Sequence, residues 1–498
     1  MKRPLPCYRL AGTCRPLLWV LPLLWWVGAV HAAGVCQVAP GGTGDGSSWA
    51  QAASLQGALA DAACSEIWVK QGTYQPTAGT DRSVGFAINR PLKLYGGFAG
   101  SEAALAQRSS DASLTVLSGD IGVAGDAADN SLHVVVIGGL GPDGNGVYSS
   151  SDTAIDGLSI VGGKADQGSM ADARGAGLYC NGWGTGKQCG PAITNVVFRD
   201  NSASDVGGAI YLTGAGSLDI AKSSFLSNAA KHGGAIRVDG KGTAGSNATA
   251  IAQSTFSGNS ASQQGGALYL SGDAFAVTQS TFTANSAQWG SAAVVFNGAS
   301  LSGRFEQSTF SGNSASDRAA IRVLGVGPIA FSHLSFSANA SLWQGAAIYI
   351  DGGNSHTIES SIFGKGGVSS QPQVFAKTGA AVPVQRSIVE GGCPTRVTCT
   401  DTIDADPLLQ PLADNGGSTH TMLPGAGSPA IDVAGSCSAQ TTDQRGLARN
   451  VHGACDLGAV ELQPPGAPTA VAATAGTERA SVSWTAPASD SAITGYTV

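Results

Sequence analysis

The stretch FSGNSASQQGGALYL, from Phe256 to Leu270, decides the fold because five similar stretches occur elsewhere in the chain. The phenylalanines that open the six copies are 26 to 31 residues apart, and an asparagine follows each one after three residues. An aliphatic residue comes eight or nine residues after each asparagine. The phenylalanines are Phe198, Phe225, Phe256, Phe282, Phe310 and Phe336, the asparagines are Asn201, Asn228, Asn259, Asn285, Asn313 and Asn339, and the aliphatic residues are Ile210, Ile236, Leu268, Val294, Ile321 and Ile348.

Each part of the repeat has a physical reason in a stack of coils. A phenylalanine at one fixed place per repeat can stack on its equivalents above and below. Asparagine tolerates a left-handed backbone conformation, and its amide can bond to the asparagine one coil away. The Gly-Gly-Ala run permits a sharp bend, and the residues from Ile210 to Leu212 then alternate between two faces, as a strand does. We therefore expect two or three short strands per repeat.

The composition favours a β-rich solenoid over other repeat architectures. Of 498 residues, 71 are glycine, and only 12% are charged while 43% are hydrophobic, which disfavours helical bundles, coiled coils and disorder. Helical solenoids repeat every ~33 to 47 residues, and propeller blades need about 40. Leucine-rich repeats have a similar length, but the chain lacks their leucine pattern. We expect an all-β, right-handed parallel β-helix, with the handedness that parallel crossovers prefer.

Two sets of motifs resemble known bacterial families. The paired F-x-x-N and G-G-A-[ILV] motifs resemble the repeats of polymorphic outer-membrane proteins. The stretch DNGGSTHTMLPGAGSPAID from Asp414, followed by TDQRGLARN and CDLGAVE, resembles the end of choice-of-anchor Q proteins, and the opening GGTGDGSSWAQAASLQGALADA matches the same type. This resemblance implies a pectin-lyase-like β-helix on an exported bacterial protein, and it implies no activity.

Composition and motifs divide the chain into six segments. They are a signal peptide (1–32), an N-terminal cap (33–80), the β-helix (81–410), a choice-of-anchor-Q-like C-terminal segment of the β-helix (411–462), a Pro-rich linker (463–468) and the start of a fibronectin type III domain (469–498). A capping helix is expected between Ser48 and Ala63, where it would cover the end of the stack. Resemblance to fibronectin type III makes Trp484 the core tryptophan and Tyr496 a strand tyrosine, and the rest of that sandwich would follow Val498.

The amino terminus and the net charge indicate export. Basic residues precede an apolar run from Leu17 to Val30, and small residues follow at Ala32 and Ala33, as in a secretory signal peptide. The run is shorter than the ~20 residues of a membrane span, so we expect no span in the mature chain. The net charge of −7 repels phosphate, so nucleic acid is not an expected partner. We expect a monomer that is secreted or held at the bacterial surface or outer membrane.

The cysteines are expected to form disulfides. Two of the ten lie in the leader, and the other eight fall into four pairs of near neighbours. A solenoid brings sequence neighbours together, so local pairing is the simplest expectation, and disulfides fit an oxidising compartment. Zinc is the alternative, but the chain lacks tight C-x-x-C knuckles with nearby histidines. The expected pairs are Cys36 with Cys64, Cys180 with Cys189, Cys393 with Cys399, and Cys437 with Cys455.

Two acidic groups are candidates for chemistry. Calcium could bind through Asp401, Asp404 and Asp406, but this stretch lacks the glycine and distal glutamate of a calcium loop, so a solvated turn is favoured and no cofactor is expected. The second group is Asp432, Asp443, Arg445 and Asp456. Buried Asp–Arg pairs can fix loop geometry through paired hydrogen bonds, and we favour that role over catalysis.

Tyr211, Tyr269 and Tyr349 are the candidate binding residues, because each follows an aliphatic anchor and should point outward. Aromatic faces stack on sugars and anchor protein interfaces. These repeats are not consecutive, so a continuous stripe is not expected, and covering of neighbouring apolar surface is the alternative. Arg237 and Arg322 also follow anchors and should point outward. The histidines His232, His333 and His356 occupy unrelated places, so no metal site is expected.

Adhesion or binding without catalysis is the favoured function, with a glycan or a host or cell-surface protein as the partner. The leader, the repeats and the lack of a coherent catalytic cluster motivate it. The alternative is a polysaccharide-degrading enzyme, a lyase or glycoside hydrolase with a groove on the β-helix face.

Overall fold

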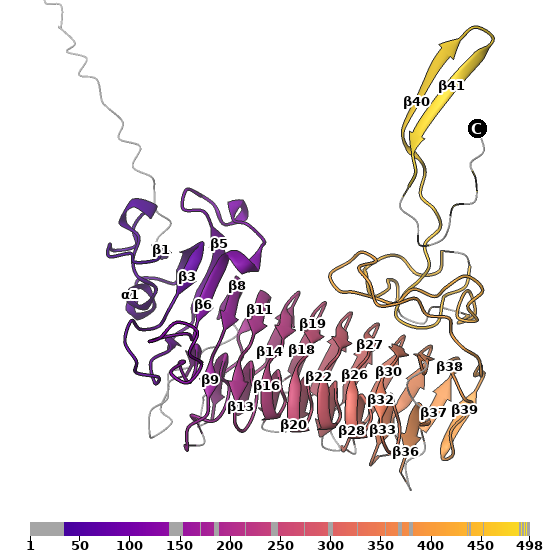
Figure 1. Ribbon diagram of the computed structural model, residues 1–498, viewed down its shortest axis with the longest axis horizontal. Helices are drawn as coiled ribbons and strands as arrows, with labels where there is room; N and C mark the ends of the chain where they lie inside the picture. The colour runs from indigo at the N-terminus through magenta and orange to yellow at the C-terminus, as the bar shows by residue number, and fades with distance from the viewer. Residues whose placement is uncertain are drawn as a thin grey trace, which may run out of the picture. The chain divides into compact units, whose positions relative to one another are not determined.

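A computed structural model describes residues 34–495 except 139–152, 170, 184–188, 215, 241–247, 273, 297–301, 326, 354, 367–370, 378–381, 436, 438–439, 452, 488–489, 491–492 and 494. The described residues form a parallel β-solenoid whose windings follow one another along the chain (Figure 1). The expected all-β, right-handed parallel β-helix is confirmed. The expected signal peptide lies outside the described residues. Within them, no helix is long and apolar enough to cross a membrane.

Three parallel sheets account for the strands of the described windings. The first sheet contains β1 (Val35–Val38), β2 (Glu66–Lys70), β3 (Gly72–Tyr74), β5 (Lys93–Phe98), β6 (Thr115–Ser118), β8 (Ala154–Val161), β11 (Ala192–Arg199), β14 (Leu218–Ala221), β15 (Ser224–Leu226), β18 (Ala248–Ala252), β19 (Thr255–Ser257), β22 (Ala274–Thr278), β23 (Thr281–Thr283), β26 (Gly303–Glu306), β27 (Thr309–Ser311), β30 (Ile329–Ser332), β31 (Ser335–Ser337), β34 (Thr357–Glu359), β35 (Ile362–Phe363), β37 (Val382–Gln385), β38 (Ile388–Val389) and β39 (Val397–Thr400). The second sheet contains β4 (Phe86–Ile88), β7 (Val135–Ile137), β10 (Leu178–Gly182), β13 (Ile210–Gly214), β17 (Ile236–Gly240), β21 (Leu268–Ser271), β25 (Ala293–Phe296), β29 (Ile321–Val323), β33 (Ile348–Ile350) and β36 (Val374–Ala376). The third sheet contains β9 (Lys164–Ala165), β12 (Ser202–Ala203), β16 (Ala229–His232), β20 (Ser260–Gln264), β24 (Ser286–Trp289), β28 (Ser314–Arg318) and β32 (Ala340–Ser341).

From β14 to β38, the two strands that a winding contributes to the first sheet meet at a residue with positive φ. Between β14 and β15 this residue is Lys222, with φ 50°, and between β18 and β19 it is Gln253, with φ 51°. The conformation costs about 1–2 kcal/mol for an L residue. The bend nevertheless keeps the N–H of Lys222 bonded to the carbonyl of Ala252 in the next winding, at 3.1 Å. The same conformation occurs at Asn195, Gln279, Gln307, His333, Ser360 and Arg386.

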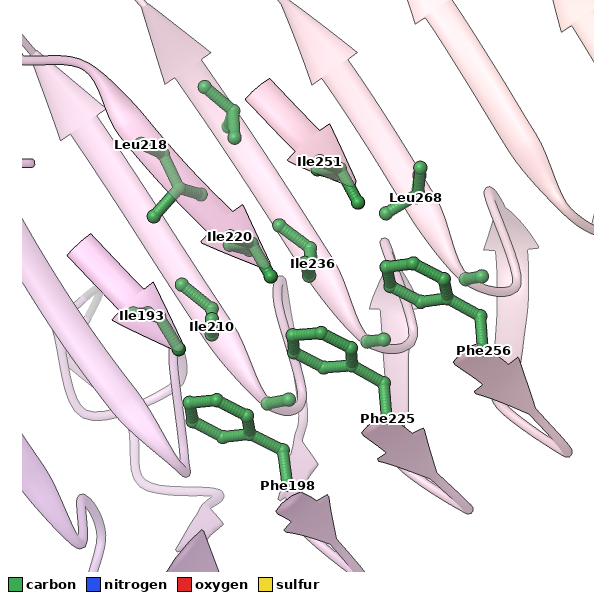
Figure 2. Packing of buried hydrophobic residues seen from close by; sticks show 14 of the residues in the cluster. Ile193, Phe198, Ile210, Leu218, Ile220, Phe225, Ile236, Ile251, Phe256 and Leu268 are labelled. Carbon is green, nitrogen blue, oxygen red and sulfur yellow. The ribbon is translucent and has the colours of Figure 1, made fainter. Parts of the chain in front are cut away.

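Phenylalanine and asparagine form two columns along the windings. Phe225 stacks between Phe198 and Phe256, with ring centroids 5.0 and 4.7 Å away and planes within 3° of parallel, and Figure 2 shows these rings in line. Asn228 donates from its side-chain amide to the amide oxygen of Asn259, at 3.0 Å. The six repeat asparagines are at most 1% exposed. The core therefore contains a polar ladder in which each amide bonds to the next.

The Gly-Gly-Ala run makes the turn before β13, β17 and β21 of the second sheet. Its first glycine has positive φ, as at Gly233 with φ 64°. Its second glycine has no room for a side chain, because a Cβ on Gly234 would lie 2.1 Å from the carbonyl oxygen of Gly266. The alanine that follows, Ala235, is fully buried.

The aliphatic anchors point into the core with one exception. Ile210, Ile236 and Leu268 are fully buried in the main core (Figure 2). The expectation for Val294 was wrong, because strand pairing places Ala293 beside Leu268 and Val294 beside Tyr269. Ala293 and Val294 are adjacent, small and apolar, so the sequence alone allows either of them to face the core.

The expected single helix at the amino end is two short helices. They are the 3-10 helix η1 (Trp49–Gln51) and α1 (Leu55–Ala60), and two further 3-10 helices are η2 (Leu105–Gln107) and η3 (Ala112–Leu114). The helix is interrupted because the N–H of Ala53 donates to Gln37 of β1, at 2.9 Å. Ser54 then caps α1 by accepting from the N–H of Gly57.

Residues 411–462, expected as the last part of the β-helix, form no regular strand among their described residues. They lie against the first sheet instead. The amide of Gln444 donates to the hydroxyl of Thr281 at 2.9 Å and accepts from that of Thr309 at 2.7 Å. Asp443 accepts from the amide of Gln279 through its backbone carbonyl, at 3.0 Å.

The residues expected to begin a fibronectin type III domain form an antiparallel hairpin of β40 (Thr469–Gly476) and β41 (Arg479–Thr485). Its side chains are exposed except for Val482 and Trp484, which are half-buried. Tyr496 lies outside the described residues.

Four disulfides are present among the described residues, and they join the expected pairs. Cys36 bonds to Cys64, Cys180 to Cys189, Cys393 to Cys399 and Cys437 to Cys455. The first links β1 to the residues just before β2, and the last lies within residues 411–462.

Candidate functional site

The outward side of the second sheet carries a row of aromatic and basic side chains. In β13, Ile210 and Leu212 belong to the main core, whereas Tyr211 packs in a separate outer cluster with Tyr179. Strand pairing brings the equivalent residue of every winding beside the next, and we call this row the aromatic face. Its members in winding order are Val136, Tyr179, Tyr211, Arg237, Tyr269, Val294, Arg322, Tyr349 and Phe375.

Arginines pack on the tyrosine rings of this face. The guanidinium of Arg237 lies 3.6 Å from the ring centroid of Tyr269, and that of Arg174 lies 5.4 Å from the ring of Tyr211. Such cation–π contacts contribute about 0.5–2 kcal/mol each. They also cover the rings, so Tyr211 is only 3% exposed, and burial raises its pKa.

In the amino-terminal half of the face, each arginine has a close carboxylate. Arg174 donates to Asp205 at 2.8 Å, and Arg237 lies 2.6 Å from Asp239. His232 packs nearby, edge-on to Tyr269. Its pKa is lowered by burial and by Arg237, so it is neutral at pH 7. The charges of this half are therefore balanced by direct ion pairs.

In the carboxy-terminal half the arginines are less closely paired. Arg318 extends over the ring of Tyr349 at 4.8 Å, and Arg322 lies 5.6 Å from the ring of Trp289. The nearest carboxylate is 3.9 Å away in both cases, Asp317 for Arg318 and Asp351 for Arg322. Tyr349 also stacks on Phe375, with ring centroids 5.2 Å apart.

Asp239 and Asp351, two of the carboxylates beside the aromatic face, are far apart along the solenoid. Asp239 lies on β17 and Asp351 directly follows β33, and these strands are four windings apart in the second sheet. At about 4.8 Å per strand, the two acids are about 19 Å apart. Paired carboxylates of glycosidases lie about 5–9.5 Å apart. These two acids therefore do not form such a pair.

The three candidate tyrosines share the outward position of the second sheet. Two of them offer little free ring, because Tyr211 and Tyr349 are 3% and 2% exposed, while Tyr269 is half-buried. The row is longer than expected, because Tyr179 and Phe375 extend it. Their windings lack the regular F-x-x-N spacing, but an aliphatic residue before each aromatic residue was a signal that could have found them.

The buried Asp443 and Arg445 hold residues 411–462 together. Their side chains lie 2.9 Å apart and are at most 1% exposed. Asp443 also accepts from the N–H groups of Leu447 and Glu461, while Arg445 donates to the carbonyl of Glu461. The pair therefore fixes loop geometry.

Three acids lie close enough to hold a metal ion among the described residues, namely Asp432, Asp456 and Glu461. Asp456 accepts from the N–H groups of Asp432 and Leu462, at 2.8 Å each. Glu461 accepts from the N–H groups of Asn450 and Asp456. Burial raises the pKa values of Asp456 and Glu461. Backbone N–H groups thus occupy the positions around these carboxylates that a bound metal ion would take.

The acids at 401–406 serve turns. Asp404 accepts from the N–H of Gly391 at 2.8 Å, and Asp406 accepts from that of Leu408 at 2.8 Å. Asp401 has positive φ and is exposed.

His333 is fully buried beside residues 411–462, and neither ring nitrogen has a hydrogen-bond partner among the described residues. Burial lowers its pKa to about 3, with smaller contributions from Arg449 and Arg386. The third histidine, His356, contacts the carbonyl of Gly352 at 2.7 Å. These histidines do not gather into a metal site within the described chain.

Comparison with known proteins supports the repeat assignment over a small part of the chain. Residues 195–213 and 253–271 match the Chlamydia polymorphic membrane protein repeat. No curated protein matches the sequence. The crystal structure of pectate lyase Pel9A is similar at 14% identity with a TM-score of 0.41, over 86% of this chain and 96% of that chain. The repeats are thus similar to those of a bacterial membrane-protein family.

Proposed function

We propose that this protein is an exported bacterial surface protein that binds a glycan or a protein along its aromatic face and does not degrade its ligand. The repeats similar to those of polymorphic membrane proteins support the surface location. Four disulfides support an oxidising, extracellular environment.

The observation that carries the binding function is the row from Tyr179 to Phe375, whose members are aromatic or arginine side chains except for the buried Val294. Each winding presents one side chain at the same outward position, so the row repeats at about 4.8 Å. Aromatic and arginine side chains are those that most often anchor interfaces. Half-buried members such as Tyr269 can still present part of their surface to a ligand.

Two features of the same face support binding without catalysis. Asp239 and Asp351 are each held by a cation, Arg237 at 2.6 Å and Lys377 at 2.7 Å. Each ion pair engages the carboxylate oxygens that a catalytic acid or base would have to present to a substrate. Their separation of about 19 Å also exceeds the reach of a glycosidase pair.

A glycan array and a panel of extracellular proteins, probed with the full chain, test the proposal. Tyr269→Ala should weaken binding strongly, while Ser314→Ala, an exposed position on β28 of the third sheet, should leave it unchanged. Each bound glycan is then incubated with the protein and assayed for new reducing ends and unsaturated products. Turnover, or equal binding by both variants, would contradict the proposal.

We also propose roles for the two ends of the described chain. The α1 helix contacts β4 and the first strands and would cap the amino end of the solenoid. Residues 411–462 would be a choice-of-anchor-Q-like ending that covers part of the first sheet. The β40–β41 hairpin would be the first hairpin of a fibronectin type III sandwich, with Trp484 in its core.

A further inference from the structure

We propose that the carboxy-terminal half of the aromatic face binds the anionic group of an acidic sugar, a carboxylate or a sulfate, at Arg318 and Arg322. This proposal rests on the binding function proposed above and specifies its ligand. The anion would interact with both guanidinium groups, and the neighbouring rings would contact the sugar.

The two guanidinium groups lack hydrogen-bond partners among the described residues. Arg322 is 8% exposed, and its buried Nε has no acceptor. The nearest carboxylate to either arginine lies 3.9 Å away, beyond hydrogen-bond distance. A buried guanidinium without acceptors is unfavourable, and this applies to Arg322. The side chain of Arg318 is 30% exposed, so this guanidinium is the one that an anionic ligand reaches first.

The nearby carboxylates are engaged by other groups. Asp317 accepts from the indole N–H of Trp289, and Asp351 lies 2.7 Å from the ammonium of Lys377. Three cations, Arg318, Arg322 and Lys377, therefore share two carboxylates. Burial and repulsion from Arg318 both lower the pKa of Arg322, which is the effect that an anion between the two would relieve.

Aromatic rings identify the rest of the ligand as a sugar. Trp289, Tyr349 and Phe375 surround the arginines, from one winding before them to two windings after them. Of these, Trp289 and Phe375 are half-buried and keep exposed surface. Such surfaces stack on the apolar faces of sugars, while arginine pairs bind carboxylate or sulfate with two hydrogen bonds.

The amino-terminal half of the face provides an internal comparison. Arg174 and Arg237 have carboxylates at 2.8 and 2.6 Å, so an anion would have to displace them. The structure thus restricts the anion site to the windings from β24 to β36.

Titration calorimetry with the full chain tests the assignment. The probes are a galacturonate hexamer, its methyl ester, dextran sulfate and dextran. The acid or the sulfate should bind about tenfold or more tightly than its neutral counterpart. Arg318→Gln should remove that preference, and added salt should weaken it. Arg304→Gln on β26 of the first sheet, whose side chain is 54% exposed, is the matched control and should change binding less than about twofold.

The arms separate the possible results. Preference for galacturonate assigns a carboxylate, and preference for dextran sulfate assigns a sulfate. Equal binding of charged and neutral probes would overturn the anion site, and so would equal effects of Arg318→Gln and its control Arg304→Gln. Either result leaves the proposed binding function standing. Failure of every probe here, together with failure on the glycan and protein arrays, overturns both. Arg322→Gln gives a second test through the deeper guanidinium.

Discussion

Replacing Asn259 by alanine should destabilise the middle of the solenoid by about 4 kcal/mol. The side chain makes four hydrogen bonds while fully buried: it donates to the carbonyl of Phe225 at 2.9 Å and to Asn285 at 3.0 Å, and it accepts two bonds from Asn228 at 3.0 Å. The alanine variant leaves at least two buried backbone groups, the N–H of Asn228 and the carbonyl of Phe225, without these partners. Each orphaned group costs about 1–3 kcal/mol.

Hydrogen exchange is the suitable assay because a solenoid opens locally rather than as a unit. A loss of about 4 kcal/mol should speed exchange of the surrounding amides about 1,000-fold, read by mass spectrometry of peptides spanning 225–285. Ser262→Ala, an exposed change in the same winding, is the control and should alter exchange by less than threefold. If Asn259→Ala exchanged within about tenfold of this control, the ladder would not be a major source of stability.

Three further predictions concern backbone space, pH and disulfides. Gly234→Ala should prevent correct packing because its Cβ would lie 2.1 Å from a carbonyl oxygen, whereas Gly312→Ala, whose Cβ meets nothing within 4 Å, should cost about 1–2 kcal/mol; thermal unfolding compares the two. His333 has a pKa near 3 when folded against 6.5 when unfolded, so its contribution to stability is complete above pH 6.5 and falls on acidification. From pH 7 to pH 5 urea unfolding should show a loss about 2 kcal/mol larger in the wild type than in His333→Gln. Removing the Cys36–Cys64 bond, which spans 28 residues, by the double alanine variant should cost about 3–4 kcal/mol in the same urea assay.

The columns of the core could be predicted from the sequence because their spacing is local and repeated. Phe256 and Asn259 recur at fixed positions, and parallel windings must then superimpose them. The register of β25 could not be predicted, because Ala293 and Val294 are both small and apolar. Only pairing with the neighbouring strands decides which of them faces the core.

The packing of residues 411–462 could not be predicted from periodicity. Gln444 bonds to Thr281, 163 residues away in the sequence. No motif around either residue indicates that the two lie in contact. The buried pair of Asp443 and Arg445 was expected to fix loop geometry. The surface that these loops cover depends on contacts that no short stretch of sequence contains.

The same repetition explains why the position of the aromatic face could be predicted but its ligand could not. The core requires an aliphatic residue at Ile321 and Val323 and places no such demand on Arg322 between them. Each winding can therefore change its outward residue at little cost to the fold. Val294, the one apolar member in the middle of the row, separates a half whose arginines are tightly paired from a half whose arginines lack acceptors. That division depends on which cations the two acids pair with in the folded chain. Asp239 pairs with Arg237, whereas Asp351 pairs with Lys377. The arginines of the second half are therefore the ones that can bind an anion.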